Sequence, residues 1–475
     1  MDERISTGIL NLDSLIEGGI PRSSTVMIAG NSGTGKTILS SQFIYNGLTS
    51  TSVEPGVYIS FSESKAQFYA NSKKIGMDFE KFEKQMKFMF LDFISIENDG
   101  VQDVFEEILS SIITVNAKRV VLDSFTAMSM SFKDRNEARI AIQVFLGKMM
   151  RAEGITNLII VEVPYGNQNL GNGIEESVAD GVIKLEHGID NASPLFLQVL
   201  KMRGSAINRE KHVCNITNNG IILYPKQSLK MNFPVTDRRI QSGITSFDER
   251  IDGNGLIEGT ISAVIGATGC GKSTFAFQFI AEGVRKFNDI GIFCSLEDSE
   301  EEIRRLGKGF GYNMSEMETN GRLSIRVYNP DEYNPDAFIA DLEVQIKETK
   351  TKRLVIDGLS AFERKYKNDL YVITKRISSL TRRYQITTLV TMLGAQTNGF
   401  QFTDLNLSPL FQNIVLLRFV ELYGRMKRVL LILKINVSHQ DESILEFKIS
   451  KDKGIEIMGP IGNDYTGIFT GISRK

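Results

Sequence analysis

The sequence predicts two consecutive α/β domains, each with a mainly parallel, twisted sheet flanked by helices. Two observations lead to this fold class. A set of motifs occurs twice in the same order, and apolar runs rich in β-branched residues alternate with segments of helical periodicity. We assign the first domain to residues 1–234 and the second to residues 235–475, with the join near the polar, two-proline stretch 224–239.

The duplication extends through both halves of the 475-residue chain. Four pairs of segments correspond: "ISTGILNLD" (5–13) and "IQSGITSFD" (240–248), "GVYISFSES" (56–64) and "GIFCSLEDS" (291–299), "RVVLDS" (119–124) and "RLVIDG" (353–358), and "VLKMRGS" (199–205) and "ILKINVS" (432–438). Because their order and spacing are kept, we interpret the pattern as a tandem repeat of a whole domain rather than a short solenoid repeat.

The expected elements follow from local periodicity. The apolar runs 25–30 and 261–266 predict buried strands, and the segments after residues 36 and 272 place apolar side chains at helical spacing. Residues 101–113 and 335–350 predict two further helices, and a few added strands are expected late in each half.

Between the first strand and the first long helix of each half lies a loop of the form G-x-x-x-x-G-K-[ST]. Glycines let the backbone curl so that successive N–H groups point at a phosphate chain, and the helix directs its positive end at the anion. An ordinary glycine-rich turn is the alternative, but the strand–loop–helix context in both halves favours phosphate binding. The expected contacts are Gly30, Asn31, Ser32, Gly33, Thr34, Gly35, Lys36 and Thr37, and Gly266, Ala267, Thr268, Gly269, Cys270, Gly271, Lys272, Ser273 and Thr274.

The last loop residues carry the chemistry. Lys36 and Lys272 would reach the β- and γ-phosphates, and the hydroxyl groups of Thr37 and Ser273 would hold Mg²⁺. The cofactors predicted at this point are therefore a nucleoside triphosphate and Mg²⁺.

A second metal ligand is expected at the end of a buried strand in each half. Asp123 and Asp357 end the strands "RVVLD" and "RLVID", where Mg²⁺ or its water needs a carboxylate. The alternative is a helix N-cap, because Ser124 and Gly358 follow. The matching position in both halves favours the metal role.

The turns "SFSES" and "SLEDS" follow strands that should neighbour the phosphate loops. Glu63 in the first half, and Glu297 with Asp298 in the second, could orient or deprotonate a nucleophile. A solvated surface turn is an equally good reading of the spacing.

Composition narrows the class of protein. The formal net charge of −2 argues against a broad nucleic-acid-binding face, and no apolar run is long enough to predict a membrane span. The start of the chain is charged and lacks a signal-peptide core. Three cysteines fit a reducing cytoplasm without disulfides, and we interpret Cys270 as a small loop filler rather than a redox site.

Taken together, these motifs resemble the KaiC family of RecA-like ATPases over nearly the whole chain. The resemblance implies a RecA-like fold in each half, ATP bound between neighbouring subunits, and a two-tiered homohexameric ring. It also implies slow ATP hydrolysis and, as in circadian members, phosphorylation of the protein by its own second half. A regulatory protein partner is a further implication.

The catalytic residues of the family match this chain with gaps. The family's acid turn has two adjacent glutamates, the first a general base. Here the first half has Ser62 and then Glu63, whereas the second has Glu297 and then Asp298. The base is therefore expected only in the second half.

The family's Lys-x-Arg element reaches the γ-phosphate of the neighbouring subunit. Lys201 and Arg203 match it in the first half. The second half keeps Lys434 but has Asn436 in place of the arginine. Each half is therefore expected to lack a different catalytic part.

The autophosphorylation segment of circadian members is a Ser-Thr pair. The stretch "TDLNLSPL" (403–410) offers Ser408 but has Pro409 at the second place, and Thr403 is another hydroxyl nearby. We also expect the long C-terminal tail by which circadian members meet their activator to be missing.

The leading prediction is an ATP-hydrolysing, ring-forming signalling protein with a possible serine/threonine autokinase activity. One alternative is a scaffold that binds nucleotide for assembly only. Another is a RecA- or RadA-like recombinase, against which we find no basic tract interleaved with aromatic residues that would hold a single strand.

Overall fold

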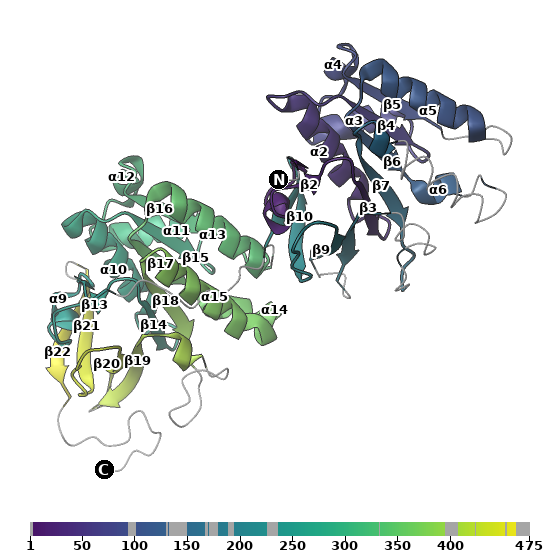
Figure 1. The fold of residues 1–475 in the computed structure, drawn as a ribbon. Helices are drawn as coiled ribbons and strands as arrows, with labels where there is room; N and C mark the ends of the chain where they lie inside the picture. The colour runs from purple at the N-terminus through teal and green to yellow at the C-terminus, as the bar shows by residue number, and fades with distance from the viewer. Residues whose placement is uncertain are drawn as a thin grey trace. The chain divides into compact units, whose positions relative to one another are not determined.

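The computed structural model describes residues 3–93, 101–129, 132, 150–166, 170, 179–188, 194–225, 236–331, 333–394, 407–422, 424–451 and 454–461. The chain divides into two compact units, Met1–Gln227 and Ser228–Lys475. Figure 1 labels the elements of each. The predicted boundary between residues 234 and 235 falls in a stretch outside the described residues and stays a prediction.

The described part of the first unit contains a nine-stranded sheet. Its order is β11 (Gly220–Tyr224), β10 (Lys211–Thr217), β9 (Leu195–Met202), β8 (Gly181–His187), β3 (Thr25–Gly30), β7 (Thr156–Glu162), β6 (Arg119–Asp123), β4 (Gly56–Ser60) and β5 (Phe88–Asp92). The strands from β8 to β5 are parallel, and β9 to β11 add an antiparallel edge.

The second unit repeats this sheet among its described residues. Its order is β16 (Leu323–Val327), β15 (Gly291–Ser295), β17 (Arg353–Asp357), β18 (Thr387–Leu393), β14 (Ile261–Gly266), β19 (Asn413–Leu422), β20 (Arg425–Ile435), β21 (Leu445–Ser450) and β22 (Gly454–Pro460). The strands from β16 to β19 are parallel, and β20 to β22 are antiparallel. The predicted late strands are therefore confirmed as an antiparallel extension.

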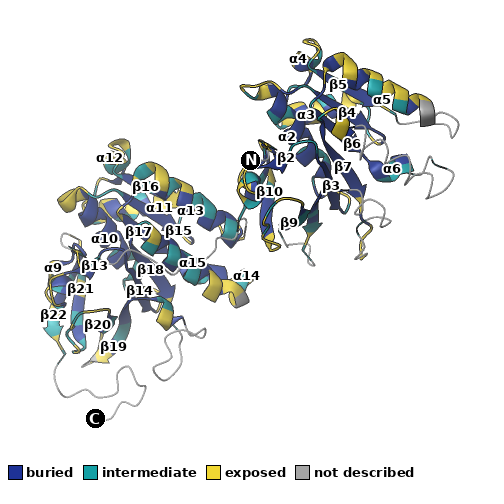
Figure 2. Cartoon of the chain, in the orientation of Figure 1, coloured by how far each residue is buried: buried dark blue, intermediate teal, exposed yellow. Residues whose placement is uncertain are grey.

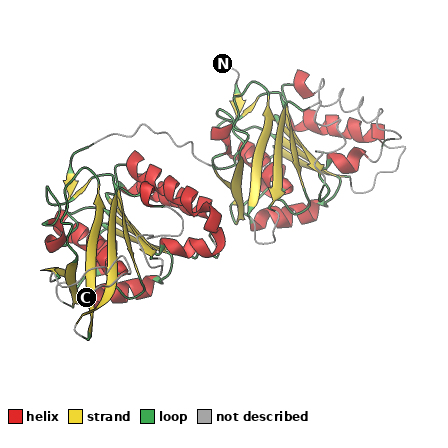
Figure 3. Ribbon diagram, turned by 90° about the horizontal axis from the view of Figure 1, so that it is seen from below, coloured by secondary structure: helices red, strands yellow, loops and turns green. Residues whose placement is uncertain are grey.

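Helices cover both faces of each sheet (Figure 3). In the first unit these are α1 (Leu12–Leu15), α2 (Lys36–Thr49), α3 (Lys65–Lys74), α4 (Glu80–Glu83), α5 (Val101–Val115) and α6 (Phe125–Ser129). In the second they are α9 (Thr245–Asp248), α10 (Lys272–Phe287), α11 (Glu300–Gly309), α12 (Met314–Thr319), α13 (Pro335–Thr349), α14 (Glu363–Tyr366) and α15 (Leu370–Arg383). The short pairs β1 (Arg4–Ile5) with β2 (Ile20–Pro21), and β12 (Arg239–Ile240) with β13 (Leu256–Ile257), stand beside the sheets.

The core of each unit lies on the two faces of its central strand. Every residue of β3 and of β14 is buried (Figure 2), as a parallel strand covered on both faces requires. In the second unit, apolar side chains of α10 pack on one face and those of α13 and α15 on the other. This architecture confirms the predicted fold class, two tandem RecA-like domains.

Local signals explain where helices begin. Asn334 caps α13 by accepting a hydrogen bond from the backbone N–H of Ala337, and Pro335 occupies the first turn. Ser299 and Glu302 form a reciprocal capping box at the start of α11. The three cysteines are free and buried. In the described part of the chain, no helix combines the length and apolar character needed to cross a membrane.

Candidate functional site

The first glycine-rich loop connects β3 to α2 and is as tightly wound as its sequence predicts. A Cβ atom on Gly30 would lie 2.4 Å from the carbonyl oxygen of Leu185 and 2.8 Å from Oγ1 of Thr34. Gly33 and Gly35 adopt φ angles of 80° and 84°, which side chains rarely tolerate. Glycine is therefore required for this backbone path.

The second loop, between β14 and α10, follows the same path. A Cβ on Gly266 would lie 2.3 Å from the carbonyl oxygen of Leu417 and 2.7 Å from Sγ of Cys270, and Gly269 and Gly271 have φ angles of 78° and 111°. Cys270 is fully buried, and this burial raises the pKa of its thiol. A buried, protonated thiol is consistent with a filler role.

The loop lysines fold back over their own loops. Nζ of Lys36 donates to the carbonyl oxygen of Asn31 at 2.7 Å, and Nζ of Lys272 donates to that of Ala267 at 2.9 Å. Burial lowers the pKa of Lys36. Each ammonium group therefore lies inside its loop and suits an anion held there.

The proposed metal ligands meet in both halves. Oγ1 of Thr37 donates to Asp123 at 2.8 Å, and Oγ of Ser273 donates to Asp357 at 3.2 Å. Both carboxyl groups are buried, and desolvation raises the pKa of each, so the ionised forms would gain from a cation. A hydroxyl and a carboxylate side by side are oxygen ligands of the kind that Mg²⁺ prefers.

The alternative role of these aspartates as helix caps has no support in the described contacts. Oγ of Ser124, the residue after Asp123, accepts from the backbone N–H of Ala127 in the first turn of α6. In the second half, Gly358 stands at the cap position of the short helix η2 (Leu359–Phe362), without a side-chain cap bond. The carboxylates point toward the loops instead.

Sequence reasoning missed a hydroxyl group beside each of these aspartates. The Tyr58 hydroxyl, from β4, donates to Asp123 at 2.7 Å, whereas in the second half Thr391, from β18, donates to Asp357. The two hydroxyls come from different strands, so a comparison of the repeats could not find them.

The two acid turns have the same backbone geometry. Oγ of Ser60 accepts from the N–H of Glu63 at 2.9 Å, and Oγ of Ser295 accepts from the N–H of Asp298 at 2.8 Å. Glu297 therefore occupies the turn position that Ser62 holds in the first half. The second residue after the strand is therefore a carboxylate, Glu297, in the second half and a hydroxyl, Ser62, in the first.

The side chains of the acid turns are also held differently. Oε1 of Glu63 accepts from Nδ2 of Asn71 at 2.7 Å. The side chain of Glu297 packs against Gly358, where a Cβ would lie 2.8 Å from Cγ of Glu297. Burial raises the pKa of Glu63 and of Asp298, which favours proton uptake by either. Glu297 lies close to Asp357 and so to the second phosphate loop.

The Lys-x-Arg segment of the first half lies far from its own phosphate loop. Lys201 pairs with Val182, which lies beside Met27 in β3, three residues before Gly30. At about 3.3 Å per residue this is roughly 10 Å along the strand, and Arg203 lies beyond it, in the direction away from the loop. Arg203 therefore lies at the edge of the domain that is farthest, along the strands, from its own phosphate loop.

The corresponding edge of the second half carries the candidate phosphosite. Nζ of Lys434 donates to the carbonyl oxygen of Phe411 at 2.9 Å, just as Nζ of Lys201 does to Ala179 at 2.7 Å. Ser408 begins the adjacent short helix η4 (Ser408–Leu410) and is exposed. Thr403 lies outside the described residues.

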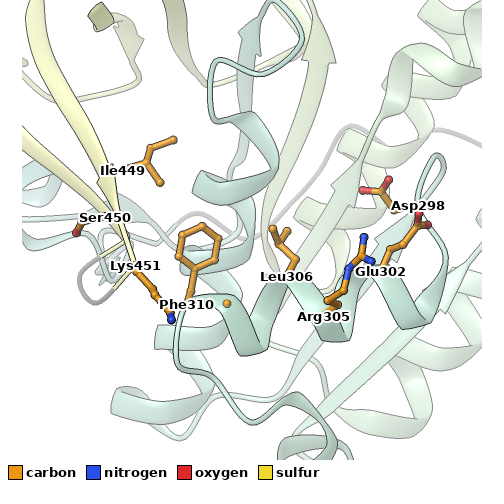
Figure 4. Close-up of a pocket in the computed structure, with 9 residues that line it drawn as sticks. Asp298, Glu302, Arg305, Leu306, Phe310, Ile449, Ser450 and Lys451 are labelled. Atoms are coloured by element: carbon orange, nitrogen blue, oxygen red, sulfur yellow. The ribbon is translucent and has the colours of Figure 1, made fainter.

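A pocket of about 520 Å³ flanks the second phosphate loop. Figure 4 shows Leu306 and Phe310 on one side of this pocket and Ile449, Ser450 and Lys451 on the other, and Asp298 is a further lining residue. Ile449 contacts the loop, because a Cβ on Gly271 would lie 2.8 Å from its side chain.

The first half keeps part of this pocket wall. Ile216 lies against Gly35 in the way that Ile449 lies against Gly271, at 2.9 Å from a Cβ placed there. Ile75, at the end of α3, stands where the second half has Phe310 at the end of α11. In addition, Arg428 of β20 donates to the carbonyl oxygen of Gly269 at 3.4 Å, a cation beside the second loop that sequence reasoning missed.

Comparison with known proteins agrees with this geometry. The family model for the KaiC ATPase matches residues 5–228 and again residues 240–461. The chain belongs to the KaiC family. It is 31% identical to the circadian clock protein KaiC3 of a Synechocystis species, covering 99% of this chain and 94% of that protein. It is 28% identical to the circadian clock oscillator protein KaiC of Prochlorococcus marinus, covering 100% and 96%, and 28% identical to that of Synechococcus elongatus, covering 97% and 90%. The predicted family is therefore confirmed.

Proposed function

We propose that this KaiC-family chain is an ATP-hydrolysing, ring-forming regulatory protein of the cytoplasm, with serine autokinase activity in its second domain. The observation that carries the proposal is the repeated arrangement of a wound loop, an inward lysine, and a hydroxyl–carboxylate pair. It occurs in both halves, at the carboxyl ends of parallel strands where ligands of such sheets bind.

The residues divide the work as follows. Lys36 and Lys272 would neutralise phosphate charge, and Thr37 with Asp123, and Ser273 with Asp357, would hold Mg²⁺, which when bound supplies further neutralisation of the phosphates. Hydrophobic residues of the pocket beside the second loop would cover the base of ATP, with Phe310 as its aromatic surface.

Glu297 would accept the proton from water or from a serine hydroxyl. Ser62 cannot do this, so we propose that hydrolysis and phosphotransfer belong mainly to the second domain. We assign the boundary between the domains to residues 234 and 235.

The position of Lys201 and Arg203 supports the proposal of ring assembly. They lie at the end of the sheet away from their own loop, so we propose that they serve a phosphate on a neighbouring copy of the chain rather than the one in their own domain. The same applies to Lys434 and Ser408 in the second half. We propose a homohexamer with ATP at its subunit interfaces, and a regulatory protein as a further partner.

Light scattering tests the ring. A ligand that binds only the assembled state stabilises it by mass action, so Mg-ATP should produce a species near six subunits. A monomer that ATP does not change would contradict the proposal.

Complementation tests the trans role of Arg203. In a Lys272→Ala background, Arg203→Ala and Lys36→Ala chains prepared separately should each have little first-domain turnover, since an arginine placed in trans contributes about 10³–10⁵ in rate. After mixing and reassembly, some interfaces pair an intact Lys36 with an intact Arg203, and turnover should return. If the parent first domain turns over and mixing restores nothing, Arg203 does not act in trans; if the parent is silent, ATP affinity is the readout.

A second candidate function is a scaffold that binds ATP for assembly only. Ser62 in the first half and Asn436 in the second favour it, because each removes a catalytic group. Steady-state phosphate release, measured together with the intact mass after incubation with Mg-ATP, separates the two: a scaffold releases no phosphate and gains no mass.

A further inference from the structure

Arg203 is held at its domain edge by a buried acid. Nη1 of Arg203 donates to Oδ1 of Asp180 at 3.0 Å, and the backbone N–H of Arg203 donates to the carbonyl oxygen of Asp180 at 2.9 Å. The Arg203 side chain is 60% exposed, whereas that of Asp180 is 8% exposed. One end of the guanidinium is therefore fixed to the domain while much of it faces solvent.

Asp180 is itself fixed from two sides. Oδ2 of Asp180 accepts from the backbone N–H of Thr25, the first residue of β3, at 3.1 Å, and from Arg151 at 2.5 Å. One carboxylate and two guanidinium groups leave a net charge of +1 at this edge, so Asp180 does not cancel the attraction for an anion. The acid is thus anchored to the central strand β3 by a hydrogen bond rather than lying loosely on the surface.

The second half has neutral residues at both corresponding positions. Oε1 of Gln412 accepts from the backbone N–H of Ile261 at 3.1 Å, which is the bond that Asp180 makes with Thr25. Asn436 stands where Arg203 stands. The structural bond to the central strand is kept by an uncharged amide, and the carboxylate occurs only in the half that has the arginine.

Another anchor of the same segment is kept in both halves. Arg4 donates to Oγ of Ser205 at 2.8 Å, and Arg239 donates to Oγ of Ser438 at 2.6 Å. The turn after β9 or β20 is therefore tied to the short N-terminal strand whether or not the arginine is present. Folding of the turn does not explain the acid at residue 180.

We propose that Asp180 is a positioning residue for Arg203: it fixes the guanidinium at the edge of the first domain, ready for the phosphates bound by a neighbouring subunit. This inference rests on the proposed function. A free arginine side chain would lose rotamer entropy on meeting the phosphate, and the ion pair removes part of that cost in advance. Because Asp180 engages Nη1, the other N–H groups are left for a phosphate oxygen.

Transplantation into the second domain, which keeps Glu297, tests the pair. Asn436→Arg should raise steady-state phosphate release above the parent, and Gln412→Asp with Asn436→Arg should raise it about tenfold further, because small errors in placement cost large factors in rate. The control Gln412→Asp alone should raise nothing, and addition of Lys272→Ala should remove every gain.

The outcomes distinguish the positioning role of Asp180 from the trans role of the arginine. If the double variant is no faster than Asn436→Arg, Asp180 has no positioning role although the trans arginine stands. If Asn436→Arg itself gives no gain in a folded, ATP-binding ring, the trans arginine is wrong and the inference is wrong with it.

A second measurement does not depend on turnover. Asp180→Asn keeps an oxygen for the N–H of Thr25 but removes the charge that holds Arg203. Modification of Arg203 by phenylglyoxal, followed by peptide mass spectrometry, should then become several-fold faster, while exposed Arg209 reacts at its parent rate. An unchanged Arg203 rate would show that Asp180 does not restrain it.

Discussion

The two domains of this chain share their phosphate loops and differ in what surrounds them. Both keep the inward lysine and the hydroxyl–carboxylate pair. The acid turn has Ser62 in one half and Glu297 in the other, and the far edge has the Asp180–Arg203 ion pair in one half only. Binding of a phosphate chain needs a closely defined backbone path over the whole loop. A catalytic side chain, in contrast, can be replaced by a single substitution without changing that path.

The two halves therefore keep the same candidate phosphate-binding groups and differ in their candidate catalytic groups. The second half has Glu297, the proposed base, and an aromatic residue in its pocket wall, whereas the first half has Arg203 paired with Asp180. Compared with the family pattern, each half therefore lacks one of the groups expected to take part in ATP hydrolysis.

Loss of a loop lysine should affect the two halves unequally. Lys272→Ala should abolish phosphate incorporation at Ser408, because in the proposed function Lys272 holds the nucleotide of the domain that contains Glu297. Lys36→Ala should mainly impair assembly. Intact mass and light scattering on the same samples measure both, with Ser408→Ala as the control for the phosphosite. Incorporation that survives in Ser408→Ala would show that the autokinase assignment is wrong.

Removal of a buried arginine should affect the two halves equally, because both keep it. Arg119 and Arg353 each form an ion pair with an acid and stack on a phenylalanine, with ring distances of 4.6 and 4.8 Å. Arg119→Ala or Arg353→Ala should lower the free energy of unfolding of its domain by about 3–5 kcal/mol. Denaturant unfolding, monitored by hydrogen exchange in each domain, measures this loss of stability.

The matched control for these variants is Arg304→Ala on α11. Arg304 forms ion pairs with Glu300 and Glu318 that are open to solvent, so its loss should cost no more than about 1 kcal/mol. Equal effects of the control and the buried variants would argue against a structural role for the buried pairs.

A carboxylate at residue 62 should narrow the difference in ATP turnover between the two halves. In a Lys272→Ala chain, Ser62→Glu should raise phosphate release by roughly 10²-fold, the lower end of what general base catalysis contributes. Ser62→Gln, similar in size but without a base, is the control. A gain of the same size in both variants would contradict the assignment of a base at this turn position.

The stability of the second domain should depend slightly on pH. Asp248 is buried, and burial raises its pKa to about 6, above the value near 3.9 expected in the unfolded chain. Between these two pKa values the folded domain holds a proton on Asp248 that the unfolded chain has released. Asp248 therefore adds to the stability of the domain as pH falls from 8 to 5, and this contribution is lost as pH rises through 6. The gain should be about 1 kcal/mol relative to Asp248→Asn, which does not titrate. Parallel pH dependence of the two proteins would contradict it.

Much of the fold and the centre of each site could be predicted from the sequence. Strands such as β3 and β14 are continuous apolar runs, and helices such as α2 and α10 carry their apolar side chains at helical spacing, so local chemistry determines both. The phosphate loops are contiguous, and glycine at the left-handed positions is a local requirement. The two aspartates could be found because each ends a strand of the repeated motif.

The remaining contacts were decided by tertiary structure, because they join residues from different strands. Nothing near Tyr58 or Thr391 in the sequence indicates a bond to a distant aspartate; the sheet order places β4 beside β6, and β18 beside β17. Asp180 meets Arg203 because antiparallel pairing of β8 and β9 brings residues 23 positions apart to one edge. The candidate phosphate loops could be located from the sequence, since their backbone path depends on neighbouring residues. Which side chains surround those loops depends on strand pairing, and only the folded sheet brings these side chains together.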